Sequence, residues 1–164
     1  MTAQKASKAP TGLLGLTWGD DAAEAGRAAG LKLDRWDPWV DPAFETSIDL
    51  DNPRVVLGVE GLVRLVRVGV KQLDGVQVVY RGCARDEARR RTLRDGLRHE
   101  LHVKAPDVDV PYETWEDGSL VHLASDPSDD TCTLTVAGPR FGKAFAAVLL
   151  RGGVGNLGGA IGPK

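Results

Sequence analysis

Residues 44–50 have the sequence Phe-Glu-Thr-Ser-Ile-Asp-Leu, in which apolar and polar side chains alternate. A period of two is typical of a β-strand that buries one face. Two longer apolar runs follow at 55–59 and 62–70, separated by Glu60 and Gly61, a pair that predicts a tight turn. This part of the chain therefore predicts antiparallel strands joined by a hairpin.

The same reasoning extends the sheet in both directions along the chain. Leu73-Asp74-Gly75 precedes the apolar run 76–80 and predicts a second hairpin, which brings the first group to about four strands. Three more strands are predicted at 112–115, 120–124 and 131–136.

Helical spacing interrupts the strands twice. An alanine-rich segment, 21–29, begins at Asp20 or Asp21 as an N-cap and stops at Gly30. Residues 84–102 carry apolar side chains at helical spacing with mostly charged residues between them. A further short helix is expected at 141–150.

The order of one helix, four strands, one helix and three strands favours antiparallel pairing, because the connections are too short for β-α-β crossovers. We therefore predict an α+β fold: an antiparallel meander sheet of about seven strands with two main helices packed on one face. The domain spans 13–151, between a flexible lead at 1–12 and a Gly-rich tail at 152–164. It could also consist of two helix-plus-meander halves, about 13–82 and 83–138.

In its order of elements the chain is similar to small bacterial inhibitor and lipoprotein domains built from a helix followed by a meandering sheet. The resemblance implies an α+β fold and a surface that binds another protein. It assigns no residue to that surface.

The composition limits the function and the compartment. The chain has 164 residues and a net charge of -2, so it lacks the cationic excess of a protein that grips nucleic acid over its whole surface. The start of the sequence has no apolar segment typical of a secretory signal, and we expect a soluble cytoplasmic protein, or an exported one if a signal was removed. Cys83 and Cys132 would be reduced in the first case and could form a disulfide in the second.

No motif identifies catalysis, a metal or a cofactor. The Gly-x-Gly-x-x-Gly pattern at 153–158 matches a dinucleotide fingerprint, but the chain ends at Lys164, so the helix that this fingerprint needs is missing. His99 and His102 lack the spacing of a zinc-protease motif. The apolar stretch near the C-terminus is too short for a membrane span.

Three regions are candidate interfaces. Two tryptophans lie in a proline-bounded loop, the helix at 84–102 is rich in arginine, and the C-terminal segment is apolar. The segment 106–130, in contrast, has eight acidic residues and neither Lys nor Arg, an asymmetry that can orient a charged partner. The candidate residues are Trp36, Trp39, Arg90, Arg94, Arg98, Leu149, Leu150 and Leu157.

These features predict a noncatalytic protein-binding or accessory domain, such as an inhibitor, an immunity-type protein or an assembly factor, which acts by occupying a partner's surface. A second hypothesis is a small-ligand-binding domain or an enzyme whose site converges only in the fold, for example around Cys83, His99, His102 or His122. A third is a structural component that assembles through sheet edges and the Gly-rich tail.

Overall fold

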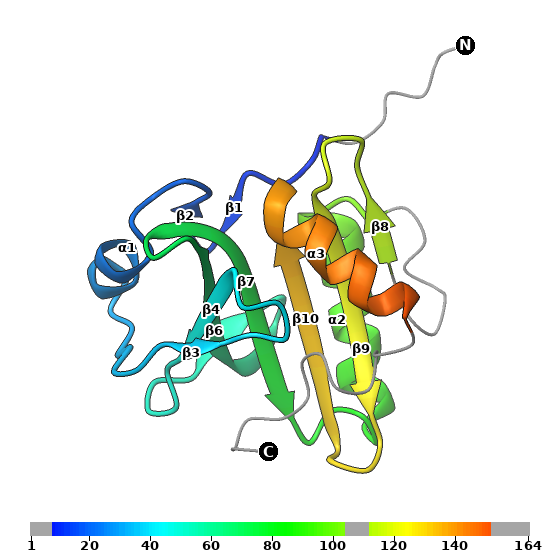
Figure 1. Cartoon of the computed structure of the whole chain (residues 1–164). Coiled ribbons are helices and arrows are strands. Elements are labelled where there is room, and N and C mark those ends of the chain that lie inside the picture. The colour runs from blue at the N-terminus through cyan, green and yellow to red at the C-terminus, as the bar shows by residue number, and fades with distance from the viewer. Residues whose placement is uncertain (1–7, 104–111, 152–164) are drawn as a thin grey trace.

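The structure is a computed structural model, and it describes residues 8–103 and 112–151. One antiparallel sheet has the strand order β3-β4-β6-β7-β10-β9-β8, with β5 paired to β6 (Figure 1). The strands of this sheet are β3 (Asp37–Pro38), β4 (Phe44–Ile48), β5 (Arg54–Val56), β6 (Val59–Val68), β7 (Gln72–Arg81), β8 (Tyr112–Thr114), β9 (Leu120–Asp126) and β10 (Thr131–Ala137). A separate hairpin joins β1 (Gly12–Leu13) to β2 (Leu16–Thr17), and the helices are α1 (Ala22–Ala28), α2 (Glu87–Glu100) and α3 (Pro139–Leu150).

The predicted α+β class and antiparallel sheet are confirmed. The strand pair β7–β10 joins the N-terminal and C-terminal groups of strands, so that the sheet is continuous through the molecule. The strands β1, β2 and β3 were not predicted, because two residues are too few to show a period. Residues 1–7 of the predicted lead at 1–12, the tail at 152–164 and the predicted site residue Leu157 lie outside the described residues, whereas Gly12, the last residue of that lead, belongs to β1.

The predicted turn at Glu60 and Gly61 is wrong. Leu57 and Gly58, both with positive φ, form the two-residue turn instead, and Val56 pairs with Val59 across it. Gly61 lies inside β6, where a Cβ atom would come within 2.6 Å of Val78. The glycine therefore serves close packing rather than chain reversal.

The predicted turn at Asp74 and Gly75 is also wrong, because both residues lie inside β7. The chain reverses before them, at Gly69, whose φ is 69°. A Cβ atom at residue 75 would lie 2.6 Å from the ring of Phe141, so this glycine makes room for α3. Asp74 accepts a hydrogen bond of 2.6 Å from the main-chain NH of Phe141 and fixes the start of that helix.

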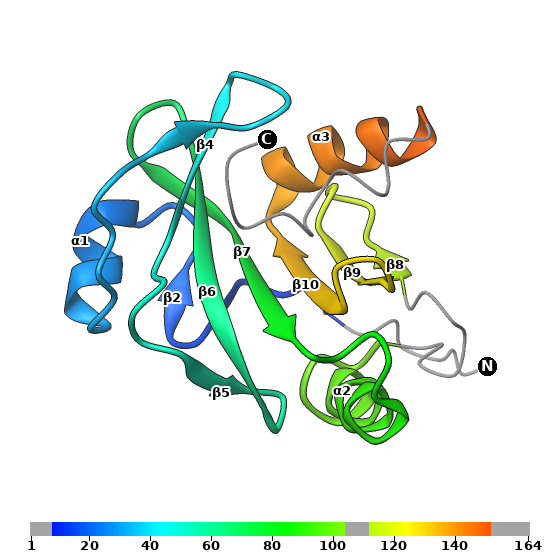
Figure 2. The same cartoon turned by 90° about the horizontal axis from the view of Figure 1, so that it is seen from below.

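The central strands β6, β7 and β10 are buried on both faces, so each face of the sheet needs a cover. Figure 2 shows α2 on one side of the sheet and α3 on the other. We call these the α2 face and the α3 face. The α2 face contains the larger core, to which α1 contributes Ala22 and α2 contributes Leu93 and Leu97. The α3 face contains a smaller core built around Phe44, Phe141 and Phe145. The two main predicted helices thus share one face, and the C-terminal helix covers the other.

Asp49, directly after β4, connects two segments that lie far apart in sequence. Its buried carboxylate accepts hydrogen bonds from the main-chain NH groups of Lys32, Asp51 and Asn52 and from the Asn52 amide. Burial alone would raise the pKa of Asp49, but these hydrogen bonds outweigh it and hold the pKa below the ordinary value of 3.8. The charged form of Asp49 therefore stabilises the fold.

We predict that Asp49→Ala lowers the free energy of unfolding by about 2–3 kcal/mol, because it leaves several main-chain donors without an acceptor. The matched control, Asp51→Ala, removes an exposed ion pair with Lys32 and should cost less than about 1 kcal/mol. Urea unfolding measures both. The stabilisation by Asp49 is present above pH 3.8 and is lost as the pH falls through the lower folded-state pKa. Equal costs for the two variants would contradict the anchoring role.

Candidate functional site

Helix α2 begins at a well-defined cap. The Asp86 side chain accepts a hydrogen bond of 3.1 Å from the main-chain NH of Arg89, and Glu87 lies in the first turn, where the helix dipole favours an acid. Leu93 and Leu97 are fully buried against the sheet and set the rotation of the helix about its axis. The charged side chains of the helix are therefore directed away from the sheet.

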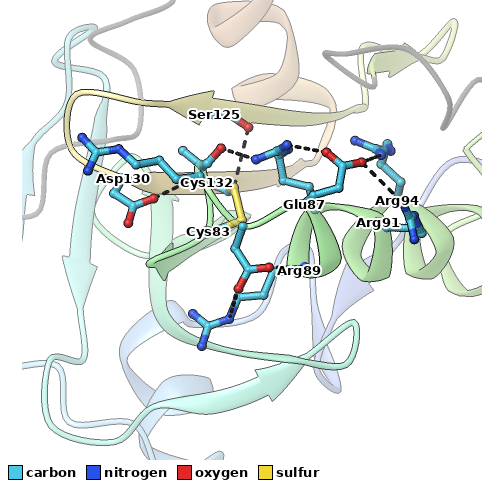
Figure 3. Close-up of polar contacts among 12 residues, drawn as sticks. Cys83, Glu87, Arg89, Arg91, Arg94, Ser125, Asp130 and Cys132 are labelled. Atoms are coloured by element: carbon cyan, nitrogen blue, oxygen red, sulfur yellow. Dashed lines mark hydrogen bonds and ion pairs between the residues drawn. A yellow bond between two sulfur atoms is a disulfide. The ribbon is translucent and has the colours of Figure 1, made fainter.

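A disulfide between Cys83 and Cys132 joins the segment that enters α2 to β10 (Figure 3). Both cysteines are fully buried. Asp130 adds further links, because its main-chain carbonyl accepts from Gly82 and Cys83 and its carboxylate accepts from the main-chain NH of Arg85. The Arg85 guanidinium also donates to the Pro127 carbonyl at 2.9 Å. The start of α2 is thus fixed to β10 by one covalent bond and to the β9–β10 turn by four hydrogen bonds.

Glu87 gathers three arginines of α2 around one carboxylate. Its oxygens lie 2.6 Å from Arg90, 3.7 Å from Arg91 and 3.6 Å from Arg94, and Figure 3 shows Arg91 and Arg94 converging on it. Arg90 also donates to the main-chain carbonyl of Ala84. These contacts gather three guanidinium groups around Glu87.

The arginines of α2 differ in exposure. Of the predicted residues, Arg90 and Arg94 are half-buried, with Arg94 only 21% exposed, whereas Arg98 is exposed. Arg91, which the sequence did not single out, is 67% exposed. Arg91 and Arg98, seven residues apart, lie on the same side of the helix, whereas Arg89 lies on the opposite side beside Asp86. The basic surface of α2 is therefore formed mainly by Arg91 and Arg98, and we call it the α2 arginine surface.

The other predicted interface residues lie elsewhere. Trp36 packs at the edge of the α2-face core, with the Arg67 guanidinium 4.1 Å above its ring. Trp39 packs on the α3 face, where its indole lies 4.8 Å from the ring of Phe141. Leu149 is half-buried against the same core, and Leu150 is 89% exposed at the end of α3.

The predicted residues therefore form two groups rather than one site. Trp39, Leu149 and Leu150 lie on the α3 side of the sheet, and the arginines lie on the α2 side (Figure 2). One partner surface cannot cover both groups without wrapping around the sheet.

Beside α2 there is a cleft of about 540 Å³, bounded by the β5–β6 hairpin and the first turns of the helix. Its lining residues include Leu50, Leu62, Val79, Arg81, Arg89 and Thr92. Sequence reasoning did not find this cleft, because its lining comes from four separate segments. Cys83, His99, His102 and His122, the residues expected to converge in an enzyme, do not line it.

A buried polar row crosses the α3 face and was also missed. Arg64, Gln77, Thr135 and His122 occupy adjacent positions on β6, β7, β10 and β9. Arg64 donates to the Gln77 side-chain oxygen at 3.0 Å, and Gln77 donates to the Thr135 hydroxyl at 3.0 Å. His122 ends the row, with its ring against Phe145. The row fixes the register of four strands, since a shift of one residue would place these groups in the opposite core.

Within residues 8–103 and 112–151, no group of three or more histidine, cysteine, aspartate or glutamate side chains is placed to hold a metal ion. In the same described ranges, none of the helices is both long enough and apolar enough to cross a membrane.

No protein-family model, no curated protein and no solved structure matches this chain.

We predict that the disulfide contributes roughly 2–4 kcal/mol to the free energy of unfolding, because it closes a loop of 49 residues in the unfolded chain. The double variant Cys83→Ala/Cys132→Ala should unfold at a lower urea concentration than the oxidised protein. A reducing agent should lower the midpoint of the wild type and leave that of the variant unchanged. Identical midpoints for the wild type and the variant would refute this contribution.

We further predict a stability change that depends on His122. Burial lowers the pKa of His122 from 6.5 to about 4. The unfolded chain therefore binds the proton first, and stability falls as the pH drops from 6.5 to about 4. The loss amounts to about 3–4 kcal/mol, from 1.4 kcal/mol per pKa unit. His122→Asn should lack this slope in urea unfolding at several pH values, and His99→Asn, on the exposed end of α2, should keep it. A full slope in His122→Asn would show that another group causes it.

Proposed function

We propose that this chain is a noncatalytic binding domain that recognises the acidic surface of a partner protein through the α2 arginine surface. It acts by occupying that surface, as an inhibitor, an immunity-type protein or an assembly factor does. The observation that carries this proposal is the pair of exposed arginines, Arg91 and Arg98, on one side of a helix whose start is held by a disulfide and a side-chain cap.

Charge supports an acidic partner. Residues 85–100 contain six arginines and four acids, although the whole chain has a net charge of -2. A local cationic surface on a protein of opposite overall charge orients the encounter with a partner. Because Glu87 already orders three of the arginines, less side-chain entropy is lost when they meet a carboxylate.

A protein partner fits this surface better than a nucleic acid. Helix α2 has the sequence EARRRTLRDGLRHE, which contains no Phe, Tyr or Trp to stack on a base. Asp129 and Asp130 lie in the turn to which the start of α2 is tied, and their charges repel phosphates. Carboxylates of a folded partner can be arranged to avoid these two acids, whereas a continuous phosphate backbone cannot.

The disulfide also supports an oxidising compartment as the place where the domain works. Disulfides persist in oxidising environments and are rare in the cytoplasm, where thiols are kept reduced. We therefore propose that the domain works outside the cytoplasm, the second of the two locations that the sequence left open.

We predict that Arg91→Glu/Arg98→Glu weakens binding to the partner about tenfold or more, because two attractive charges become repulsive. The partner would be captured on the tagged wild-type domain from an extract of the source organism and then purified. Titration calorimetry at low and at high salt gives its Kd for each variant. Affinity should also fall with salt, since the contact is electrostatic.

The matched control is Arg27→Glu/Lys143→Glu, which changes the net charge by the same amount on the exposed surfaces of α1 and α3. This control should bind like the wild type. A partner that binds both double variants with equal affinity would contradict the proposal, and so would the absence of any stoichiometric partner.

A further inference from the structure

The cleft beside α2 combines exposed apolar side chains with a charged rim. Leu62 and Val79 line the cleft but are only 6% and 0% exposed, so the apolar surface open to a ligand comes from Leu50, Pro53 and Ala88. Leu50 at the rim is 52% exposed, which leaves a large apolar side chain partly in water. A volume of about 540 Å³ lies within the range of ligand-binding clefts, roughly 300–1,000 Å³, and accommodates a few amino-acid side chains.

The walls of the cleft are fixed by direct contacts. A Cβ atom at Gly58 would lie 3.1 Å from Thr92, and one at Gly96 would lie 2.8 Å from Leu57, so the β5–β6 hairpin touches α2 closely. Arg89 donates from the helix to the main-chain carbonyls of Arg81 and Gly82. The disulfide fixes the end of the same wall. The cleft is therefore preformed, which reduces the entropy lost when a segment enters it.

The charges at the rim favour an anion. Arg81 and Arg89 line the cleft together with one acid, Glu60. The Arg89 guanidinium lies 3.4 Å from the Asp86 carboxylate, which neutralises part of its positive charge. Arg81 is exposed and makes no side-chain hydrogen bond or ion pair with the residues that the structure describes. Its guanidinium offers a bidentate site for a carboxylate.

We infer that this cleft binds a segment of the acidic partner protein in which a branched aliphatic residue adjoins a glutamate or aspartate. The aliphatic side chain contacts Leu50, Pro53 and Ala88, and the carboxylate pairs with Arg81. The inference rests on the proposed function and names the part of the partner that is recognised. Arg89 lines the cleft and lies on the other side of α2 from Arg91 and Arg98.

The test uses acetyl-Leu-Glu-Leu-amide as the probe and acetyl-Leu-Gln-Leu-amide as its neutral match. Titration of the full-length 15N-labelled protein should shift the amide signals of Gly58, Gly61, Arg81 and Thr92, with a Kd of the order of 1 mM. Arg81→Gln should weaken binding of the Glu peptide about fivefold and bring it to the level of the Gln peptide. Arg27→Gln, on α1, should change nothing.

Three results would overturn the inference: no shifts at about 10 mM peptide, shifts confined to other residues, or equal affinity for the Glu and Gln peptides. A fourth result would assign the cleft to a different kind of ligand. If 4-methylpentanoate, which has the same two groups without a peptide backbone, binds more tightly than the peptide, the cleft takes a small acid instead.

Failure of the inference and failure of the proposed function are distinguishable with the captured partner. If Arg81→Gln/Leu50→Ser binds the partner as tightly as the wild type while Arg91→Glu/Arg98→Glu is weakened, the cleft is not used and the arginine surface is. If Arg91→Glu/Arg98→Glu also keeps full affinity, the proposed function itself is contradicted. If each of the two double variants binds the partner more weakly than the wild type, the result supports both the inference and the proposed function.

Discussion

The position of α2, on which the proposed binding surface lies, depends on the covalent bond between Cys83 and Cys132. The bond joins β10, a central strand, to the residues where the chain leaves β7 and enters α2. An amphipathic helix held by Leu93 and Leu97 alone could shift along the sheet. With its start tied to the sheet, α2 keeps one position and one rotation, and this fixes both the arginine surface and one wall of the cleft.

The two faces of the sheet have different roles. On the α3 face, Trp39, Phe44, Phe141 and Phe145 form an aromatic cluster that closes one end of the sheet, next to a buried polar row that specifies strand register. On the α2 face, the cover is a helix that buries two leucines and exposes arginines. The α3 face therefore mainly stabilises the fold, and the α2 face offers the charged surface.

The sequence predicted the elements well and their three-dimensional relations poorly. Periodicity located both main helices and most strands, because one-sided burial shows in the spacing of apolar residues. It misplaced two turns, since Gly61 and Gly75 have the chemistry of turn residues but are needed for close contacts with Val78 and Phe141. It identified the arginine-rich helix but could not rank its arginines, because their exposure depends on how Leu93 and Leu97 orient the helix. The cleft and the polar row assemble from separate strands, so no local pattern could reveal them.

The most direct test is to measure the oxidation state of Cys83 and Cys132 in protein isolated from its natural source. The isolated chain would be treated with an alkylating agent under denaturing, nonreducing conditions and analysed by mass spectrometry. We expect Cys83 and Cys132 to be linked to each other and unmodified, as a fixed α2 and an oxidising compartment require. Two alkylated cysteines in the natural protein would contradict both.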